Sequence, residues 1–138
     1  MNNMKGIYID TNVFIESILR DNKECQTILE KIINKEVQGI TSILTWDELV
    51  FILRKFIGKE IAISEGEKFL RFPNLIFVDA KKEIIQNAQK LIGKYNLQPR
   101  DAIHIATAIH AGINEIVSED SDFDVIKEIK RISPGNFK

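Results

Sequence analysis

Four carboxylates stand at similar places in the chain, each at the end of a short apolar segment or near the start of the helix that follows one. They are Asp10, Glu48, Asp101 and Asp120. If they share one cleft, their repulsion has to be relieved, because two like charges 4 Å apart repel by about 4 kcal/mol at an effective dielectric of 20. Either a cation must share the cleft or some of the acids must be protonated.

The chemistry of these side chains narrows the choice of cation. All the candidate ligands are carboxylate oxygens, and no histidine or cysteine pair has the spacing of a zinc site. Oxygen ligands of this kind favour Mg²⁺ or Mn²⁺ over Zn²⁺. A divalent ion held in this way stabilises charge on a phosphoryl group and lowers the pKa of an attacking water. The acids therefore predict phosphoryl chemistry, provided that the fold brings them together.

Strand and helix patterns alternate along the chain, and their order predicts how the acids are placed. Apolar runs predict strands at residues 6–10, 39–42, 75–78 and 115–118, with a further candidate at 129–133. Helical periodicity fills the connections, and the helix that begins near Pro99 and ends before Gly112 is apolar enough to be central. This order predicts a parallel-sheet α/β fold, in which strand ends and the helix starts that follow them share one edge.

Each acid also has a purely structural interpretation, and that interpretation stays open for each one taken singly. Asp10 and Glu48 can act as helix caps, the latter in a capping box with Thr45. Asp101 lies in a first helical turn, where the helix dipole favours a negative charge, and Asp120 suits a turn. The metal-site hypothesis rests on the four occurring together at one edge.

The bulk properties fit one ordinary globular domain over residues 1–138. Hydrophobic residues make up 44% and charged residues 28% of the chain, and the net charge of −1 excludes a protein that binds polyanions through overall positive charge. The single cysteine, Cys25, excludes an intramolecular disulfide and fits a reducing compartment. The first residues, MNNMKG, lack the apolar run of a signal peptide, and no segment is long enough to span a membrane. We expect a cytoplasmic protein with no membrane association.

Four segments, in this order, resemble the motifs of PIN-domain nucleases. They are residues 7–13 (IYIDTNV), 41–49 (TSILTWDEL), 100–108 (RDAIHIATA) and 117–123 (VSEDSDF). No single motif is specific, but the ordered set spans most of a chain whose length is that of a stand-alone VapC-type toxin. The resemblance implies a three-layer fold with a short central parallel sheet flanked by helices. It also implies Mg²⁺- or Mn²⁺-dependent cleavage of RNA by a homodimer that a small antitoxin protein neutralises.

The resemblance also implies roles for individual residues. Carried over by position, the catalytic acids are Asp10, Glu48, Asp101 and Asp120, with Asp122 as a fifth candidate. Of these, Asp10, Asp101 and Asp120 are the implied metal ligands. Asn12 and Ser118 are implied to orient these acids, and Ser118 stands where the family commonly has threonine.

Two further features affect the interpretation. His104 follows Asp101 by three residues, but a histidine on an apolar helix is expected to be a packing residue rather than a general base.

The segment 12–72 holds more large apolar residues than a small domain needs, among them Phe14, Phe51, Phe56 and Phe69. A homodimer interface is predicted to cover part of that surface, although burial in the core explains the same aromatic residues equally well.

Two other functions compete with the nuclease. A haloacid-dehalogenase-like phosphatase would also place an aspartate at the end of the first strand. It would need a second acid where this chain has Asn12, which cannot act as a general acid. A non-catalytic RNA- or protein-binding module is the second alternative, and the intact set of acids argues against it.

Overall fold

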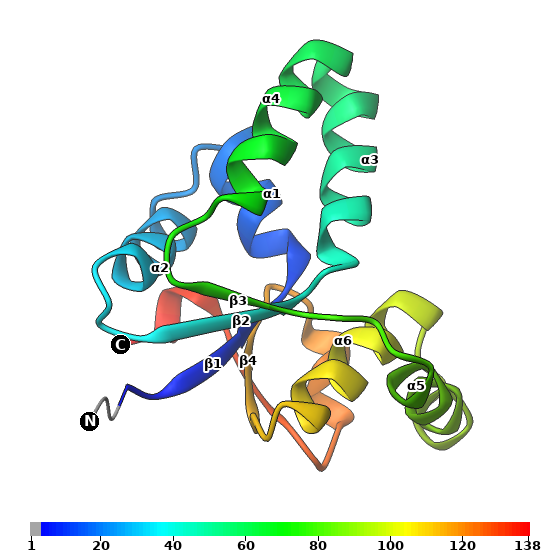
Figure 1. Ribbon diagram of the computed structural model, residues 1–138. Coiled ribbons are helices and arrows are strands. Elements are labelled where there is room, and N and C mark those ends of the chain that lie inside the picture. Colours follow the sequence, from blue (N-terminus) through cyan, green and yellow to red (C-terminus); the bar gives the residue numbers. More distant parts are fainter. Residues whose placement is uncertain (1–3) are drawn as a thin grey trace.

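A computed structural model describes residues 4–138 and contains one five-stranded sheet (Figure 1). The strands lie in the order β3-β2-β1-β4-β5, and every neighbouring pair is parallel. The strands are β1 (Gly6–Ile9), β2 (Gln38–Ser42), β3 (Leu75–Val78), β4 (Glu115–Val117) and β5 (Lys130–Ile132). The predicted strands are all present, and the candidate at residues 129–133 is confirmed as β5.

Helices cover both faces of this sheet, so the predicted three-layer α/β fold is confirmed (Figure 1). One face carries α1 (Thr11–Leu19), α2 (Lys23–Ile33), α3 (Thr45–Ile57) and α4 (Lys59–Leu70); the other carries α5 (Lys82–Tyr95) and α6 (Pro99–His110). Two short 3-10 helices, η1 (Ser121–Val125) and η2 (Pro134–Asn136), lie near the C-terminus.

Strand β1 shows why the sheet is buried on both sides. Successive side chains of a strand point to opposite faces. Ile7 and Ile9 accordingly pack into the core beneath α1 to α4, while Tyr8 packs into the core beneath α5 and α6. All three side chains are completely buried, as expected for the central strand of a parallel sheet covered by helices on both faces.

Helix α6 has the predicted central position. Pro99 occupies its first turn, where the missing N–H leaves no hydrogen bond unmade. After Asp101 the helix buries the small residues Ala102, Ala106 and Ala108, which let it lie close to the sheet and to α5. The helix ends at His110, and Gly112 then adopts a φ of +74°, the left-handed conformation predicted for it.

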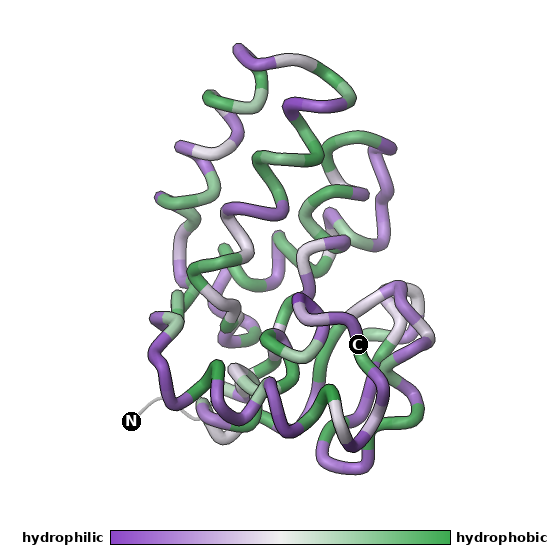
Figure 2. The backbone as a smooth tube through the Cα atoms, turned by 90° about the vertical axis from the view of Figure 1, so that its right-hand side faces the viewer, coloured by the Kyte–Doolittle hydropathy of each residue, from purple (hydrophilic) through white to green (hydrophobic). Residues whose placement is uncertain are grey.

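The hairpin of α3 and α4 projects from the rest of the molecule, and its surface mixes apolar and polar residues (Figures 1 and 2). Phe51 and Phe56 of α3 are 54% and 63% exposed. Phe14 and Phe69, in contrast, are buried, with their rings packed edge to face 5.0 Å apart. Of the four aromatic residues singled out in the sequence, two therefore belong to the core and two remain on the surface.

No helix in residues 4–138 is long and apolar enough to cross a membrane. The expectation about a signal peptide falls partly on residues 1–3, which lie outside the described residues.

Candidate active site

Asp10 follows directly after β1 and begins α1, at the carboxyl edge of the sheet. Its Oδ1 accepts a hydrogen bond from the Thr11 backbone N–H at 2.7 Å, so the capping interpretation of this residue holds. The side chain is only 8% exposed. Burial raises the pKa of Asp10, while the nearby His104 and the hydrogen bond from Ser118 act in the opposite direction. A cap alone does not require such a buried carboxylate.

Ser118 and Asn12 connect Asp10 with the loop that carries Asp120. The Ser118 hydroxyl donates to Asp10 Oδ2 at 2.6 Å and accepts from the Asp120 backbone N–H at 2.9 Å. The Asn12 amide donates to both Asp10 Oδ2 and Ser118 Oγ. These bonds agree with the orienting role implied for Asn12 and Ser118. They also show that the Asn12 nitrogen serves as a hydrogen-bond donor, which disfavours the phosphatase alternative.

Glu48 lies in the first turn of α3, but the predicted capping box is wrong. Helix α3 begins after Leu44 without a side-chain cap, and the Thr45 hydroxyl is bonded to Thr41 at 2.8 Å instead. Glu48 Oε1 lies 2.7 Å from His104 Nε2 and accepts from the Thr11 hydroxyl at 3.1 Å. Burial alone would raise the pKa of Glu48, but these contacts outweigh it and lower the pKa. The side chain therefore faces the acid site rather than its own helix end.

His104 is the residue whose surroundings the sequence did not reveal. It is buried, as expected, yet its Nε2 also lies 3.5 Å from Asp10 Oδ1. Burial alone would lower the pKa of His104, but Tyr8, Glu48 and Asp10 together raise it well above its usual value. In the sequence, only the three-residue spacing between Asp101 and His104 on one helix indicated that the histidine lies near the acids. Nothing in the sequence showed that Glu48 would reach across from α3.

Asp101 gives the clearest evidence that the four acids converge. Burial and the charges of Asp10, Asp120 and Glu48 raise the pKa of Asp101 to about 6. Neighbouring charges shift a pKa appreciably only at short range, because solvent and salt screen distant charges. The four acids from β1, α3, α6 and the loop after β4 therefore form one cluster.

Asp120 and Asp122 lie at the outer side of this cluster. Asp120 begins η1, and its Oδ1 accepts from the Asp122 backbone N–H at 2.9 Å. The Asp122 side chain is exposed and lines a cavity of about 360 Å³ together with Asp101. Asp122 is thus near the site but outside the group whose charges raise the pKa of Asp101.

The donor set fits a hard divalent cation in its chemistry. All four clustered acids offer carboxylate oxygens, and their mutual repulsion is the condition that a cation relieves. Within residues 4–138 no three histidine, cysteine or acidic side chains already stand in an arrangement that holds a metal. Cys25 is not a competing reactive group, since burial raises the pKa of its thiol to about 12.

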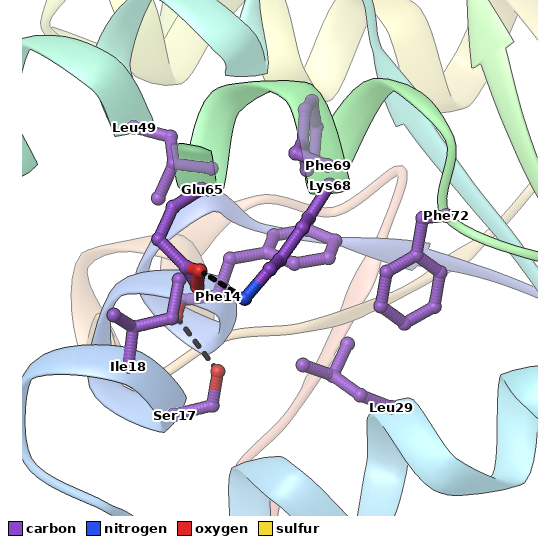
Figure 3. Close-up of a pocket in the computed structure, with 9 residues that line it drawn as sticks. All are labelled: Phe14, Ser17, Ile18, Leu29, Leu49, Glu65, Lys68, Phe69 and Phe72. Atoms are coloured by element: carbon purple, nitrogen blue, oxygen red, sulfur yellow. Dashed lines mark hydrogen bonds and ion pairs between the residues drawn. The ribbon is translucent and has the colours of Figure 1, made fainter. Parts of the chain in front are cut away.

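A second cavity, which none of the four acids lines, lies among α1, α2, α3 and α4 (Figure 3). It has a volume of about 180 Å³, and aromatic and aliphatic side chains form most of its wall. The Lys68 ammonium and the Glu65 carboxylate pair across its rim at 3.2 Å. The residues that line it are Phe14, Ser17, Ile18, Leu29, Leu49, Glu65, Lys68, Phe69 and Phe72.

Comparison with known proteins places this arrangement in a family. Ribonuclease VapC2 of Methanocaldococcus jannaschii is 30% identical over 129 residues, which cover 85% of this chain and 86% of that protein. A DNA-bound VapBC structure from Salmonella typhimurium superposes with a TM-score of 0.76 at 17% identity, over 95% of this chain and 99% of that one. A toxin–antitoxin complex from Klebsiella pneumoniae gives a TM-score of 0.69 at 21% identity, over 93% and 97% of the two chains.

The two solved structures, at these identities, support the fold alone. The family model of the PIN domain matches residues 7–129, a range that contains all four clustered acids and Asp122. By this match, and by its likeness to the VapC2 ribonuclease, the chain belongs to the PIN domain family.

Proposed function

We propose that this single PIN domain is a divalent-metal-dependent endoribonuclease and the toxin of a VapBC-type toxin–antitoxin pair. The observation that carries the proposal is the cluster of four carboxylates at the carboxyl edge of the sheet, where burial together with the charges of the other three raises the pKa of Asp101 to about 6. The relative named ribonuclease VapC2 supports RNA as the substrate. The buried, unpaired Cys25 is compatible with a cytoplasmic location.

In this proposal Asp10, Asp101 and Asp120 hold Mg²⁺ or Mn²⁺, and Glu48 and Asp122 complete the catalytic acids. The chemistry that such an ion supplies is a lowered pKa for bound water and neutralisation of charge on the phosphate. Ser118 and Asn12 fix the Asp10 carboxylate through hydrogen bonds to Oδ2. The four carboxylates repel an RNA phosphate unless a cation is present, because like charges repel at short range.

Two cavities adjoin the cluster, and in this proposal they receive a single RNA strand. One, of about 360 Å³, shares Asp101 and contains the amides of Asn96 and Gln98. The other, of about 180 Å³, shares Glu48 and contains Arg100. Arg100 is half exposed and pairs with Asp47 at 3.5 Å, so its guanidinium is available to exchange this weak contact for a phosphate. A strand that passes through both cavities would place a phosphodiester against the acids.

The purified protein, freed of any antitoxin, should cut RNA in the presence of Mg²⁺ or Mn²⁺ and stop when EDTA is added. Hydrolysis by an activated water in line with the leaving oxygen leaves a 5′-phosphate and a 3′-hydroxyl. Mapping of both product ends by sequencing would test this. A 2′,3′-cyclic phosphate would instead implicate the RNA's own 2′-hydroxyl. RNA binding without cleavage would favour the non-catalytic module.

An antitoxin is the second proposed partner. The toxin–antitoxin complex from Klebsiella pneumoniae has the same fold, and the apolar cavity of Figure 3 is a suitable surface for the apolar side chains of such a protein. The cleavage assay also tests this partner: the product of a short neighbouring reading frame should bind the chain and inhibit cleavage. Failure of that product to do either would remove the toxin–antitoxin assignment and leave the nuclease.

We also propose a homodimer, supported by the exposed aromatic residues of α3. More than half of the surface of Phe51 and of Phe56 is exposed to water. Association of two chains through α3 would bury these aromatic side chains. In sedimentation experiments at micromolar concentration, wild type should be a dimer and Phe56→Glu a monomer. Ile85→Glu, at a 40% exposed position on α5, is the control and should remain a dimer. A monomeric wild type would contradict the proposal.

A further inference from the structure

His104 connects the rigid sheet to two of the acids. Its Nδ1 lies 2.6 Å from the Tyr8 hydroxyl, and its Nε2 lies 2.7 Å from Glu48 Oε1 and 3.5 Å from Asp10 Oδ1. The imidazole is 1% exposed, so water does not compete for these contacts. Any buried imidazole needs hydrogen-bond partners, but here the Nε2 side faces two acids of the cluster from two other segments of the chain.

The orientation of the ring is itself fixed by the sheet. The Tyr8 hydroxyl accepts a hydrogen bond from the Ser42 backbone N–H at 3.0 Å, which ties it to the end of β2. The Tyr8 and His104 rings pack edge to face, with centroids 5.6 Å apart. Tyr8 lies in the middle of β1 and is completely buried. The position of His104 Nε2 is therefore set by two central strands and not by α6 alone.

Glu48 depends on this contact more than the other acids do. It reaches the site from α3, whose outer end projects from the molecule, and its long side chain has three rotatable bonds (Figure 1). The charges of Asp10 and Glu48 repel each other within the cluster. His104 and the Thr11 hydroxyl both hold Glu48 Oε1. Both contacts are therefore made to the same oxygen of the Glu48 carboxylate.

We propose that His104, oriented by Tyr8, is a positioning residue that holds Glu48 beside Asp10 in the geometry that the active site requires. The proposal rests on the metal-dependent function proposed above. Partners that orient metal-site carboxylates are worth 10- to 100-fold in metal affinity or activity in comparable sites. His104 does not touch RNA in this proposal, so its loss should leave KM nearly unchanged. It should lower kcat through Glu48, and it should weaken metal binding through the proposed ligand Asp10, whose Oδ1 lies 3.5 Å from His104 Nε2.

Three substitutions separate positioning from packing. His104→Leu keeps an apolar side chain of similar size and removes both polar contacts. His104→Gln keeps an amide N–H that can reach Glu48. Tyr8→Phe keeps the ring packing and removes only the hydroxyl. Thr107→Val is the matched control, because Thr107 lies on the same helix and is 1% exposed, but its hydroxyl bonds only to its own helix, at the Ile103 carbonyl.

The measurements are the Mn²⁺ dissociation constant by titration calorimetry, kcat and KM on a cleavable RNA, and the melting temperature. We expect His104→Leu to raise the dissociation constant and to lower kcat by about 10- to 100-fold, with KM changed less than about threefold. His104→Gln should recover part of this loss, and Tyr8→Phe should show an intermediate loss. Thr107→Val should bind Mn²⁺ like wild type, whatever its melting temperature.

Wild-type Mn²⁺ affinity together with wild-type kcat in His104→Leu would overturn the proposal, as would an equal loss in Thr107→Val. If His104→Leu does not fold, Tyr8→Phe decides, and wild-type affinity and kcat in that variant would overturn the role of the pair. Weakened Mn²⁺ binding without any RNA cleavage by wild type would refute the proposed ribonuclease and leave the positioning role supported. A wild type that neither binds Mn²⁺ nor cuts RNA would refute both.

Discussion

Asp101→Asn is expected to abolish RNA cleavage while it raises the melting temperature of the metal-free protein at neutral pH. Loss of an orienting partner costs 10- to 100-fold, so loss of a ligand itself should lower kcat by more than about 100-fold. The gain in stability has a separate cause. Burial and three neighbouring carboxylates raise the pKa of Asp101 to about 6, so its charge destabilises the folded state above that pH. Asparagine keeps the shape and removes the charge.

The expected gain in the free energy of unfolding follows from the shift in the pKa of Asp101. A rise from 3.8 to about 6 corresponds to at most about 3 kcal/mol, which partial solvent exposure reduces to about 1–2 kcal/mol. For a domain of this size each kcal/mol moves the melting temperature by about 2–6 °C. Millimolar Mn²⁺ should stabilise wild type and not the variant, because a ligand stabilises only the state that binds it.

Asp79→Asn is the matched control for this experiment. Asp79 also follows a strand at the carboxyl edge of the sheet, but it is exposed and lies beyond β3, at the sheet's margin. Its substitution should leave cleavage, the melting temperature and the Mn²⁺ effect as in wild type. A lower melting temperature in Asp101→Asn, with no change in the response to Mn²⁺, would mean that Asp101 is a helix-dipole partner and not part of a metal site.

Asp10 is a poorer choice for the same test, for a reason that only the structure gives. Its carboxylate accepts hydrogen bonds from Thr11, Asn12 and Ser118, which stabilise the charged form. Neutralising it would relieve repulsion and weaken these bonds at once, so the net change in stability has no certain sign. Asp101 lowers the stability of the folded state through burial and repulsion without comparable bonds.

The sequence was sufficient to predict convergence of the acids because one geometric rule carries the inference. Short strands that alternate with helices leave few arrangements besides a parallel sheet. Asp10 and Asp120 follow the neighbouring strands β1 and β4, so their proximity needed only the correct strand order. Gly112 and Pro99 were predictable for a local reason, since each suits one backbone conformation at a helix end.

The contacts of individual side chains were not predictable in the same way. Thr45 and Glu48 have the spacing of a capping box, and that pattern contains no information about Thr41 or His104, which compete for the same side chains. Tyr8 looked like an ordinary strand residue, although its hydroxyl bonds to His104 from another segment. The exposure of Phe51 and Phe56 depends on how α3 and α4 project from the sheet. Periodicity alone does not determine this.

The second large effect is expected in the dependence of stability on pH. In the folded, metal-free protein the pKa of Asp101 is about 6, against 3.8 for the ordinary group. Between these values the folded state retains a proton that the unfolded state has lost. The resulting stability is fully present below about pH 4 and is lost as the pH rises through about 6. Asp10, whose pKa is also raised, acts in the same direction.

His104 and Glu48 also contribute to the pH dependence of stability. The raised pKa of His104 adds stability that is complete below its unfolded value of 6.5 and is lost at higher pH. The lowered pKa of Glu48 adds stability above its unfolded value of 4.5 that is lost as the pH falls. The contribution of Asp101 is therefore best measured as the difference between wild type and Asp101→Asn at each pH.

That difference should be small near pH 4, where Asp101 is protonated in the folded state, and resembles asparagine there, and is only partly ionised in the unfolded state. It should grow to about 1–2 kcal/mol in favour of the variant above about pH 6. Urea unfolding of both metal-free proteins at several pH values measures it, with Asp79→Asn expected to show no such trend. Addition of Mn²⁺ near pH 7.5 should make wild type the more stable protein. A difference of equal size at pH 4 and pH 7.5 would show that the gain comes from the amide group and not from removal of a charge that the cluster repels.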